Sequence, residues 1–339
     1  MKKISVFLLF IALASCKNDV KKATEVPSKA VYVDSLYALN TSFEVGDVRR
    51  YGVEPGVKIG QHPKLLKDKL DVLMDISELG IKLYFPKGVY DRTLNIEKRE
   101  AVKIVSDSAL FTGAVTIKNS SSIYIDGVIQ SLSSFYIQNS NDIEINSILT
   151  KTDSLIKKKM LRSTGVSIHG GAKNVRINKV LIKDSGSGSR HYKYIKGGLI
   201  VHGHNNEPRE IKIDSAIVES SDRHGVYLTG VDIDIKYLHV KKFGVGTADD
   251  MAPMEGGIDG EQVNFSGLWI KNCHDSFIDE AIIDTNKSKG KFSVNFDIGQ
   301  EFRPTTIEKL VINHQGSKNN IEKRIFSRTG VIVGETIEQ

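Results

Sequence analysis

The sequence is poor in the residues that cross-link or interrupt a fold. Its 339 residues include 2 cysteines, 7 prolines and 1 tryptophan. Two cysteines allow at most one disulfide, which excludes a disulfide-rich scaffold and leaves the fold to rest on an apolar core. No apolar run approaches the roughly 20 residues that a transmembrane helix needs. No stretch of clustered Lys and Arg marks a basic helix either, so we expect no nucleic-acid partner.

The first residues carry an export signal. Lys2 and Lys3 precede an apolar run over residues 4–14, which has the length of a signal peptide and is short for a membrane span. The run ends in Leu-Ala-Ser-Cys at residues 13–16, which resembles the lipobox of bacterial lipoproteins. The resemblance implies that residues 1–16 form a lipoprotein signal peptide, that Cys16 is lipidated, and that the lipid anchors the exported protein to the cell envelope, at the outer membrane. The alternative is an ordinary secreted protein with a chance cysteine.

Residues 17–42 are polar and charged and show no apolar period, which predicts a flexible tether. If Cys16 carries lipid, Cys273 has no disulfide partner. The formal net charge is +6, and loss of two lysines with the leader lowers it to about +4. This mild excess suits an acidic glycan, although lysines scattered over a solvated surface explain it more simply.

Residues 43–95 read as an N-terminal module with one helix. Apolar residues recur at helical spacing behind Pro63, which predicts a helix over residues 63–79. The order Val48-Arg-Arg-Tyr-Gly52, one helix, then Phe85-Pro-Lys-Gly-Val-Tyr90 resembles the start of pectate-lyase-like β-helix proteins, without their aspartate-rich turn after the first glycine. The resemblance implies a carbohydrate-active, right-handed parallel β-helix whose open end is capped by that helix.

Beyond residue 100 one pattern recurs: a short alternating strand that ends in Asn or Gly, a polar turn, then further apolar pairs. The first strands begin at Val115, Phe135, Val166, Leu199, Val226, Leu268 and Val294. Asn and Gly tolerate the left-handed backbone of a sharp corner. We therefore predict an all-β, right-handed, single-stranded parallel β-helix over residues 43–339, with a cap over 43–95. The rival fold, an antiparallel sandwich or barrel, would show Asn-Gly hairpins at even intervals, and these are absent.

The alternation also predicts which side chains face outward. The first and third residues of each first strand are apolar and face the core, so the second and fourth should face solvent. Stacked coils then expose the pairs Thr116/Lys118, Tyr136/Gln138, Ser167/His169, Ile200/His202, Tyr227/Thr229, Trp269/Lys271 and Asn295/Asp297. These pairs include two tyrosines, two histidines and the tryptophan, and exposed aromatic rings stack on the faces of sugars. The alternative is that loops cover these side chains and they are merely packed.

The longest insertions all lie between the last segment of one coil and the first strand of the next, so they border the same face. They span residues 151–164, 185–197 and 244–266. The second mixes cations with aromatic residues, as a site for an anionic glycan would, and the third is acidic.

A polysaccharide lyase needs a cation beside the uronate carboxylate, a base for the C5 proton and an acid for the leaving oxygen. Groups of these types gather around the central coils, and the predicted catalytic residues are His202, Arg223, His224, Tyr227 and Lys271. The predicted substrate-binding residues are Tyr136, His169, Lys193, Lys196, His204 and Trp269. We therefore expect a monomeric protein that binds an acidic polysaccharide and cleaves it by β-elimination.

Two other functions stay open. A glycoside hydrolase needs two carboxylates across the scissile bond; His224-Gly225 resembles the His-Gly strand of β-helix polygalacturonases, but their Asp-Asp pair has no counterpart in the preceding coil. Asp249, Asp250 and Asp259 lie in a later insertion and are candidate Ca²⁺ ligands, although their spacing matches no known loop motif. The third interpretation is a surface protein that holds a glycan without cleaving it, because a fold does not specify a function.

Overall fold

The computed structural model describes residues 34–151, 165–185, 197–203, 206–245, 265–297, 303–316, 321–325 and 330–339. Several predictions fall outside the described residues: the signal peptide, Cys16, Lys193, Lys196, His204, Asp249, Asp250 and Asp259. What rests on these residues stays a prediction.

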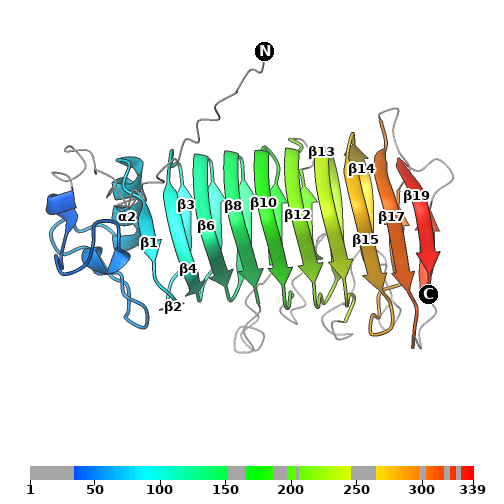
Figure 1. The fold of residues 1–339 in the computed structure, drawn as a ribbon, viewed down its shortest axis with the longest axis horizontal. Helices are drawn as coiled ribbons and strands as arrows, with labels where there is room; N and C mark the ends of the chain where they lie inside the picture. The colour runs from blue at the N-terminus through cyan, green and yellow to red at the C-terminus, as the bar shows by residue number, and fades with distance from the viewer. Residues whose placement is uncertain are drawn as a thin grey trace, which may run out of the picture.

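Parallel strands curl into a solenoid (Figure 1). Most coils hold one short strand and one long strand. The short strands stack into what we call the short-strand face: β3 (Leu94–Glu97), β5 (Val115–Lys118), β7 (Ser134–Gln138), β9 (Gly165–His169), β11 (Gly197–His202), the first half of β13 (His224–Val240), β14 (Ser266–His274), β16 (Phe292–Phe296) and β18 (Glu322–Ile325). Each of these strands pairs in parallel with the next in the series.

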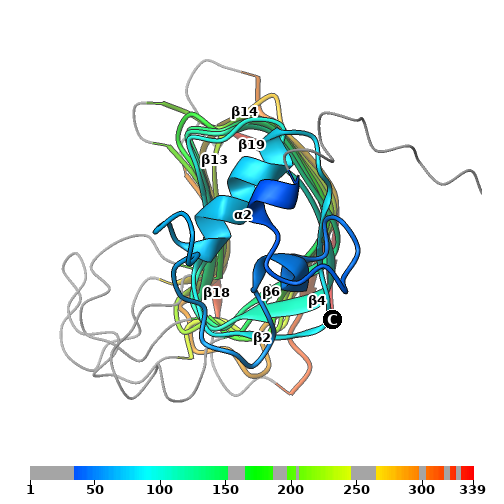
Figure 2. The same ribbon diagram turned by 90° about the vertical axis from the view of Figure 1, so that its left-hand side faces the viewer.

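The remaining strands, most of them longer, form the rest of the coil, which we call the long-strand wall. Its members are β1 (Leu83–Phe85), β2 (Gly88–Tyr90), β4 (Lys103–Phe111), β6 (Ser121–Ser131), β8 (Asn141–Thr150), β10 (Lys173–Ile182), β12 (Arg209–Val218), the second half of β13, β15 (Phe277–Asp284), β17 (Thr305–Asn313) and β19 (Val331–Glu338). The end view of Figure 2 shows the two sets enclosing one interior. The predicted all-β, parallel, β-helix-like architecture is confirmed at this level.

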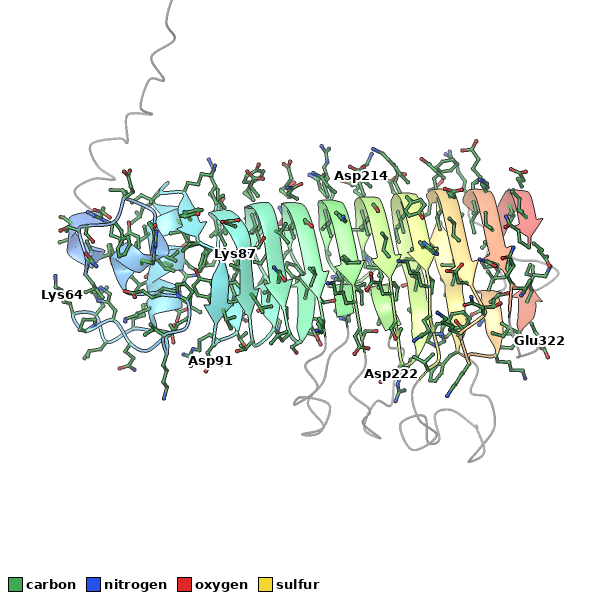
Figure 3. The ribbon with its side chains drawn as sticks, turned by 60° about the horizontal axis from the view of Figure 1, so that its bottom comes forward. Lys64, Lys87, Asp91, Asp214, Asp222 and Glu322 are labelled. Carbon is green, nitrogen blue, oxygen red and sulfur yellow. The ribbon has the colours of Figure 1, made fainter. Side chains whose placement is uncertain are left out.

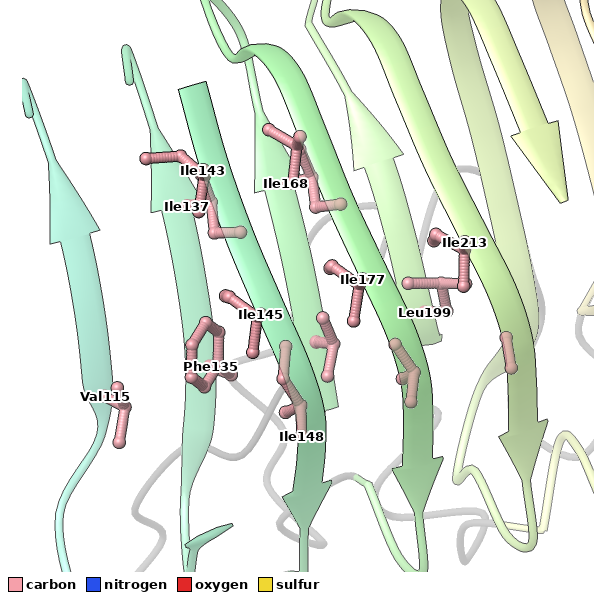
Figure 4. Close-up of a cluster of buried hydrophobic side chains, with 14 of the residues drawn as sticks. Val115, Phe135, Ile137, Ile143, Ile145, Ile148, Ile168, Ile177, Leu199 and Ile213 are labelled. Atoms are coloured by element: carbon pink, nitrogen blue, oxygen red, sulfur yellow. The ribbon is translucent and has the colours of Figure 1, made fainter. Parts of the chain in front are cut away.

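The strand register agrees with the predicted alignment residue by residue. One interior row runs Ile137, Ile168, Val201, Leu228, Ile270, each paired with the next on the neighbouring strand. None of the five is more than 2% exposed. Figure 4 shows Ile137 and Ile168 packed in the core between the two sets of strands. A slip of one residue would turn the outward side chains into this core, so the register decides which groups can meet a ligand.

Asparagine makes the corners that end several short strands. Asn119, Asn139 and Asn272 have φ angles of 50°, 47° and 48°. This left-handed conformation is one that Asn adopts more readily than most residues with a side chain. Asn139 Nδ2 also donates to Asn119 Oδ1 at 3.4 Å, so the corners stack from coil to coil.

The N-terminal module holds η1 (Val48–Tyr51) and α2 (Lys69–Glu78), and Figure 2 shows α2 across the near end of the solenoid. The helix begins at Lys69, not at Pro63 as predicted. Asp68 is its N-cap and accepts the Leu70 N–H at 2.9 Å, while Leu66 has a φ of 51° in the preceding turn. The apolar spacing extended into this turn, and spacing alone does not detect a capping side chain. No helix within the described residues is long and apolar enough to cross a membrane.

The described part of the predicted tether begins at Asp34, which is fastened to the N-terminal module. Asp34 is buried and accepts hydrogen bonds from Tyr51 Oη at 2.6 Å and Arg50 Nη2 at 2.6 Å. Burial raises the pKa of Asp34, but the hydrogen bonds from Arg50 and Tyr51 outweigh it and leave the pKa below its ordinary value. Polar composition concealed this anchor, since the partners lie a whole segment away in the sequence.

Candidate functional site

Five rings on the outer side of the short-strand face form a continuous series, which we call the ring ladder. Tyr136 stacks on His169 with centroids 6.0 Å apart, and His169 meets His202 edge-on at 6.5 Å. His202 lies 5.6 Å from Tyr227, and the Tyr227 ring lies 4.5 Å from Trp269. The rings come from β7, β9, β11, β13 and β14, so the spacing of parallel strands, about 4.8 Å, sets the spacing of the rungs.

The Trp269 end of the ladder carries a cation and a carboxylate. Trp269 Nε1 donates to Asp297 Oδ2 at 3.1 Å, and Lys271 Nζ lies 3.9 Å from the same oxygen. Lys271 Nζ is also 5.9 Å from the Trp269 ring. The side chain of Lys271 is 47% exposed and that of Asp297 is 18% exposed. Asp297 thus fixes the indole, while the ammonium stays within reach of a solute.

His224 lies under the ladder and not on it. Its ring packs 4.9 Å from Trp269 and 5.1 Å from Phe265, and Nδ1 accepts the Ser266 N–H at 3.0 Å. Burial, with a smaller contribution from the charge of Arg223, lowers the pKa of His224 to about 3. The imidazole is therefore neutral at pH 7, with its Nδ1 lone pair already engaged. We expected a catalytic group exposed to solvent, and the structure places a buried one.

Arg223 and Tyr227 are also withdrawn from solvent. Arg223 is 4% exposed, with its guanidinium carbon 5.6 Å from the Phe265 ring centroid. Tyr227 is 2% exposed, and burial raises its pKa above the ordinary value. The phenol is therefore neutral at pH 7. Of the five predicted catalytic residues, His202 and Lys271 keep partial exposure.

The expectation that the second residues of the short strands face solvent is wrong for most of them. Besides Tyr227, the buried members are Thr116, Ser167, Ile200 and Asn295. Alternation places them outward, but strands about 4.8 Å apart allow large side chains to shield their neighbours. Ile200, for example, pairs with Tyr227 in the next coil. The predicted binding residues Tyr136, His169 and Trp269 remain half-buried, with part of each ring accessible.

The described part of the short-strand face offers few groups for metal or carboxylate chemistry. No three His, Cys, Asp or Glu side chains come together there, or elsewhere in the described residues, as a metal site requires. From β7 to β16 the short strands present no carboxylate, and Asp297 follows directly after β16. A paired-carboxylate mechanism would need a second acid from outside the described residues.

Sequence reasoning missed two contributors to the site. Asp297 appeared only as one of the outward pairs, although it holds Trp269 and lies near Lys271. Phe265 fell inside a predicted insertion, yet its ring contacts His224 and lies beneath Arg223. An acidic residue in the same row as Lys271, one coil later, was the available signal for Asp297. Nothing local in the sequence marked Phe265.

Comparison of the chain with protein-family models, curated proteins and solved structures yields no match. The resemblance to pectate-lyase-like proteins thus stays a prediction, and the site must be interpreted from its own chemistry.

Proposed function

We propose that the protein is an exported lipoprotein that binds an acidic polysaccharide along the ring ladder and cleaves it by β-elimination. One observation carries the proposal: a series of rings, all partly accessible except the buried Tyr227, ends beside an exposed cation, Lys271. Rings provide stacking surfaces for sugar faces, and the ammonium supplies the charge that a uronate carboxylate needs. The strand register holds the rings and the Lys271 ammonium at fixed positions along successive coils.

In the proposed reaction, Lys271 pairs with the uronate carboxylate and so acidifies the adjacent C5–H. His202 takes the C5 proton, the C4=C5 double bond forms, and the C4–O4 bond breaks. The leaving oxygen takes a proton from the imidazolium or from water. His202 and Lys271 come from strands two coil steps apart, roughly 10 Å, and both side chains are long enough to meet one sugar ring between them.

Thr229 supports this placement. It follows Leu228 on β13, the strand between those of His202 and Lys271. Thr229 Oγ1 accepts the Gly203 N–H at 3.3 Å, which ties the corner after His202 to the next coil. Tyr227 and His224 act as positioning residues in this scheme, because Tyr227 packs between His202 and Trp269 and His224 packs under Trp269.

A non-catalytic glycan-binding protein is the second candidate, and one observation favours it. Arg223, His224 and Tyr227 are buried, so two accessible polar groups remain from the predicted catalytic set. A row of rings with one cation serves retention of a glycan as well as cleavage. A hydrolase is less favoured, since Asp297 is the one carboxylate that the described residues place beside the ring ladder, and it already holds Trp269.

The finer parts of the architecture and the location belong to the same proposal. We infer that the solenoid is right-handed and that α2 caps its exposed β edge, as the N-terminal module suggests. The lipobox-like residues 13–16 support lipid attachment at Cys16. Cys16→Ser should move the protein from the membrane fraction to the soluble one, since the lipid is attached through the thiol. Retention of the variant in the membrane fraction would contradict the anchor.

Incubation of the purified protein with polygalacturonate, alginate and hyaluronate tests the reaction. β-Elimination produces an unsaturated uronate that absorbs in the ultraviolet, whereas hydrolysis and binding do not. We expect absorbance to rise with at least one polymer. Reducing ends without absorbance would establish hydrolysis, and retention of the polymer without new ends would establish binding alone.

A further inference from the structure

We propose that the capped end of the solenoid rests on a membrane surface, with Leu65 and Leu66 in the headgroup region of the lipid. The proposal starts from the turn over residues 61–68, which leads into α2. Leu66 is 77% exposed and Leu65 is 42% exposed. Figure 3 shows the adjacent Lys64 at the extremity of the molecule that lies opposite the C-terminal coils.

The turn holds these leucines outward in a defined conformation. The N–H groups of Leu65 and Leu66 donate to His62 O at 3.2 and 2.9 Å, and the His62 N–H donates to Lys67 O at 2.7 Å. His62 is buried, with Nε2 2.9 Å from Tyr37 O. Leu66 has a φ of 51°, which leucine rarely adopts. These contacts keep both leucines on the outside of the turn.

The charge around the leucines suits an anionic lipid surface. Residues 55–67 contain Lys58, Lys64 and Lys67 and no acidic residue, and Asp68, which ends the turn, is paired with Arg92. Lys67 pairs with Asp75 at 2.6 Å, whereas Lys58 and Lys64 are exposed on the same segment. Val57, 52% exposed, adds apolar surface. An apolar tip bordered by lysines binds membranes in two ways: the apolar side chains enter the headgroup boundary, and the cations attract anionic lipids.

The N-terminal chain leads to the same end of the molecule. Asp34 is fastened to Arg50 and Tyr51 on the cap. Residues 17–33 separate it from Cys16, and a chain of that length can span at most about 60 Å. If Cys16 carries lipid, as proposed above, the cap stays within reach of the bilayer. The turn then sets the orientation, with the solenoid axis pointing away from the membrane and the ring ladder open to solution.

A cysteine reporter tests the contact without relying on lipidation. In a Cys16→Ser chain, where Cys273 is buried, an environment-sensitive fluorophore is attached at Gln61→Cys. Ile332→Cys on β19 is the matched control, since Ile332 is 55% exposed at the other end of the solenoid. Phosphatidylcholine vesicles containing phosphatidylglycerol and a lipid-borne quencher should quench the label at position 61 and leave the label at 332 unchanged. An apolar leader that binds vesicles would also bring position 61 near them, because the N-terminal chain leads to the same end of the molecule. Leader binding would leave the quenching unchanged in Leu65→Ser and Leu66→Ser, which keep residues 1–16, whereas contact through the turn requires these leucines.

Substitutions then separate the apolar and charged contributions. Leu65→Ser and Leu66→Ser should each raise the lipid concentration for half-maximal quenching by about tenfold. Lys58→Glu with Lys64→Glu should weaken binding at low salt and much less at high salt. A label at 61 that stays in water with vesicles present overturns the proposal. If the label at 61 becomes buried without vesicles, and more so at higher protein concentration, the turn contacts a second copy of the chain and the lipid proposal is wrong. Neither outcome bears on lipidation of Cys16 or on cleavage of a glycan.

Discussion

The short-strand face and the long-strand wall follow the same alternation, yet they present opposite surfaces. Ile200 and Tyr227 pair across β11 and β13 at outward positions and are nearly inaccessible. Arg176 and Lys212 pair across β10 and β12 at equivalent outward positions and are exposed. Figure 3 places Asp214 on the wall and Asp222, just before Arg223, on opposite sides of the molecule. The short-strand face is therefore largely shielded from solvent, whereas the long-strand wall is exposed to it.

The two surfaces differ in how they treat their ionisable groups. The wall satisfies its charges by local pairs such as Lys236 with Asp214 and Lys309 with Glu280, both at 2.7 Å. Solvated pairs of this kind contribute little to stability. The short-strand face instead buries His224 and Arg223, which a plain coil does not need. Burial of ionisable groups without structural need is typical of binding and catalytic sites.

The largest effect should come from a charge placed in the shared core. Leu228→Asp or Ile168→Asp should lower the free energy of unfolding by about 5 kcal/mol, because an unpaired carboxylate would enter an apolar interior. His169→Ala, next to Ile168 on the same strand, should cost far less. Denaturant unfolding checks the pair. Equal losses for Ile168→Asp and His169→Ala would mean that the two sides of the strand are not distinct.

His202→Ala should come next, and it should separate the two faces by function. Loss of a positioned base costs about 10²–10⁴-fold in rate, or roughly 3–5 kcal/mol, while glycan binding should largely persist. His239→Ala on the wall is the control, since it removes a histidine that pairs with Asp284 at 2.9 Å. Turnover is followed by ultraviolet absorbance. An unchanged rate in His202→Ala would remove this residue from the mechanism.

The buried His224 should make stability depend on pH. Its folded-state pKa is about 3 against 6.5 for the free group, so between these values the unfolded chain binds the extra proton. Stability therefore rises with pH through this window, and lowering the pH from 7 to 4 should cost about 3 kcal/mol from this residue alone. His224→Asn keeps an acceptor for the Ser266 N–H and should remove that part of the slope.

Chemical denaturation at a series of pH values measures this slope. His314→Gln is the control, because the His314 side chain is 35% exposed near the C-terminal end of the solenoid. If His224→Asn loses stability on acidification as steeply as the wild type, the histidine is not shielded in solution.

The smallest effect should be in affinity. Trp269→Leu removes a stacking surface and should weaken glycan binding by about tenfold, close to 1.4 kcal/mol. Trp269→Phe keeps a ring but loses the bond to Asp297, so it should weaken binding less. Isothermal titration with a polymer that the protein retains would compare them. Arg176→Ala on the wall should leave affinity unchanged, and an equal loss there would assign the glycan to both faces.

Much of the fold could be predicted because it rests on local patterns. The row from Ile137 to Ile270 follows from an alternation of period two and from an Asn or Gly at each corner, and both are visible along the chain. The start of α2 could not be found in this way, because the capping of Leu70 by Asp68 and the left-handed Leu66 depend on turn chemistry that apolar spacing does not report.

The site was harder to predict for a related reason. Alternation correctly directs Tyr227 outward, but its burial depends on His202 and Trp269 from adjoining coils. His224 carries no sequence mark of its low pKa, since the cause is enclosure by Phe265 and Trp269 together with the charge of Arg223. The direction in which a side chain points can be inferred from its own strand, whereas its accessibility to solvent depends on side chains from several strands.

The coil-by-coil pairing of the interior row has a consequence for how such a chain can change length in evolution. Each coil packs against its two neighbours, so stability is close to a sum of units and adjacent interfaces. A whole coil could be gained or lost near β5 or β17 without altering the rungs from β7 to β14. A duplication within those rungs would instead lengthen the ladder by one ring. The distance of the ring ladder from the N-terminal end and the number of rings in it can therefore evolve independently.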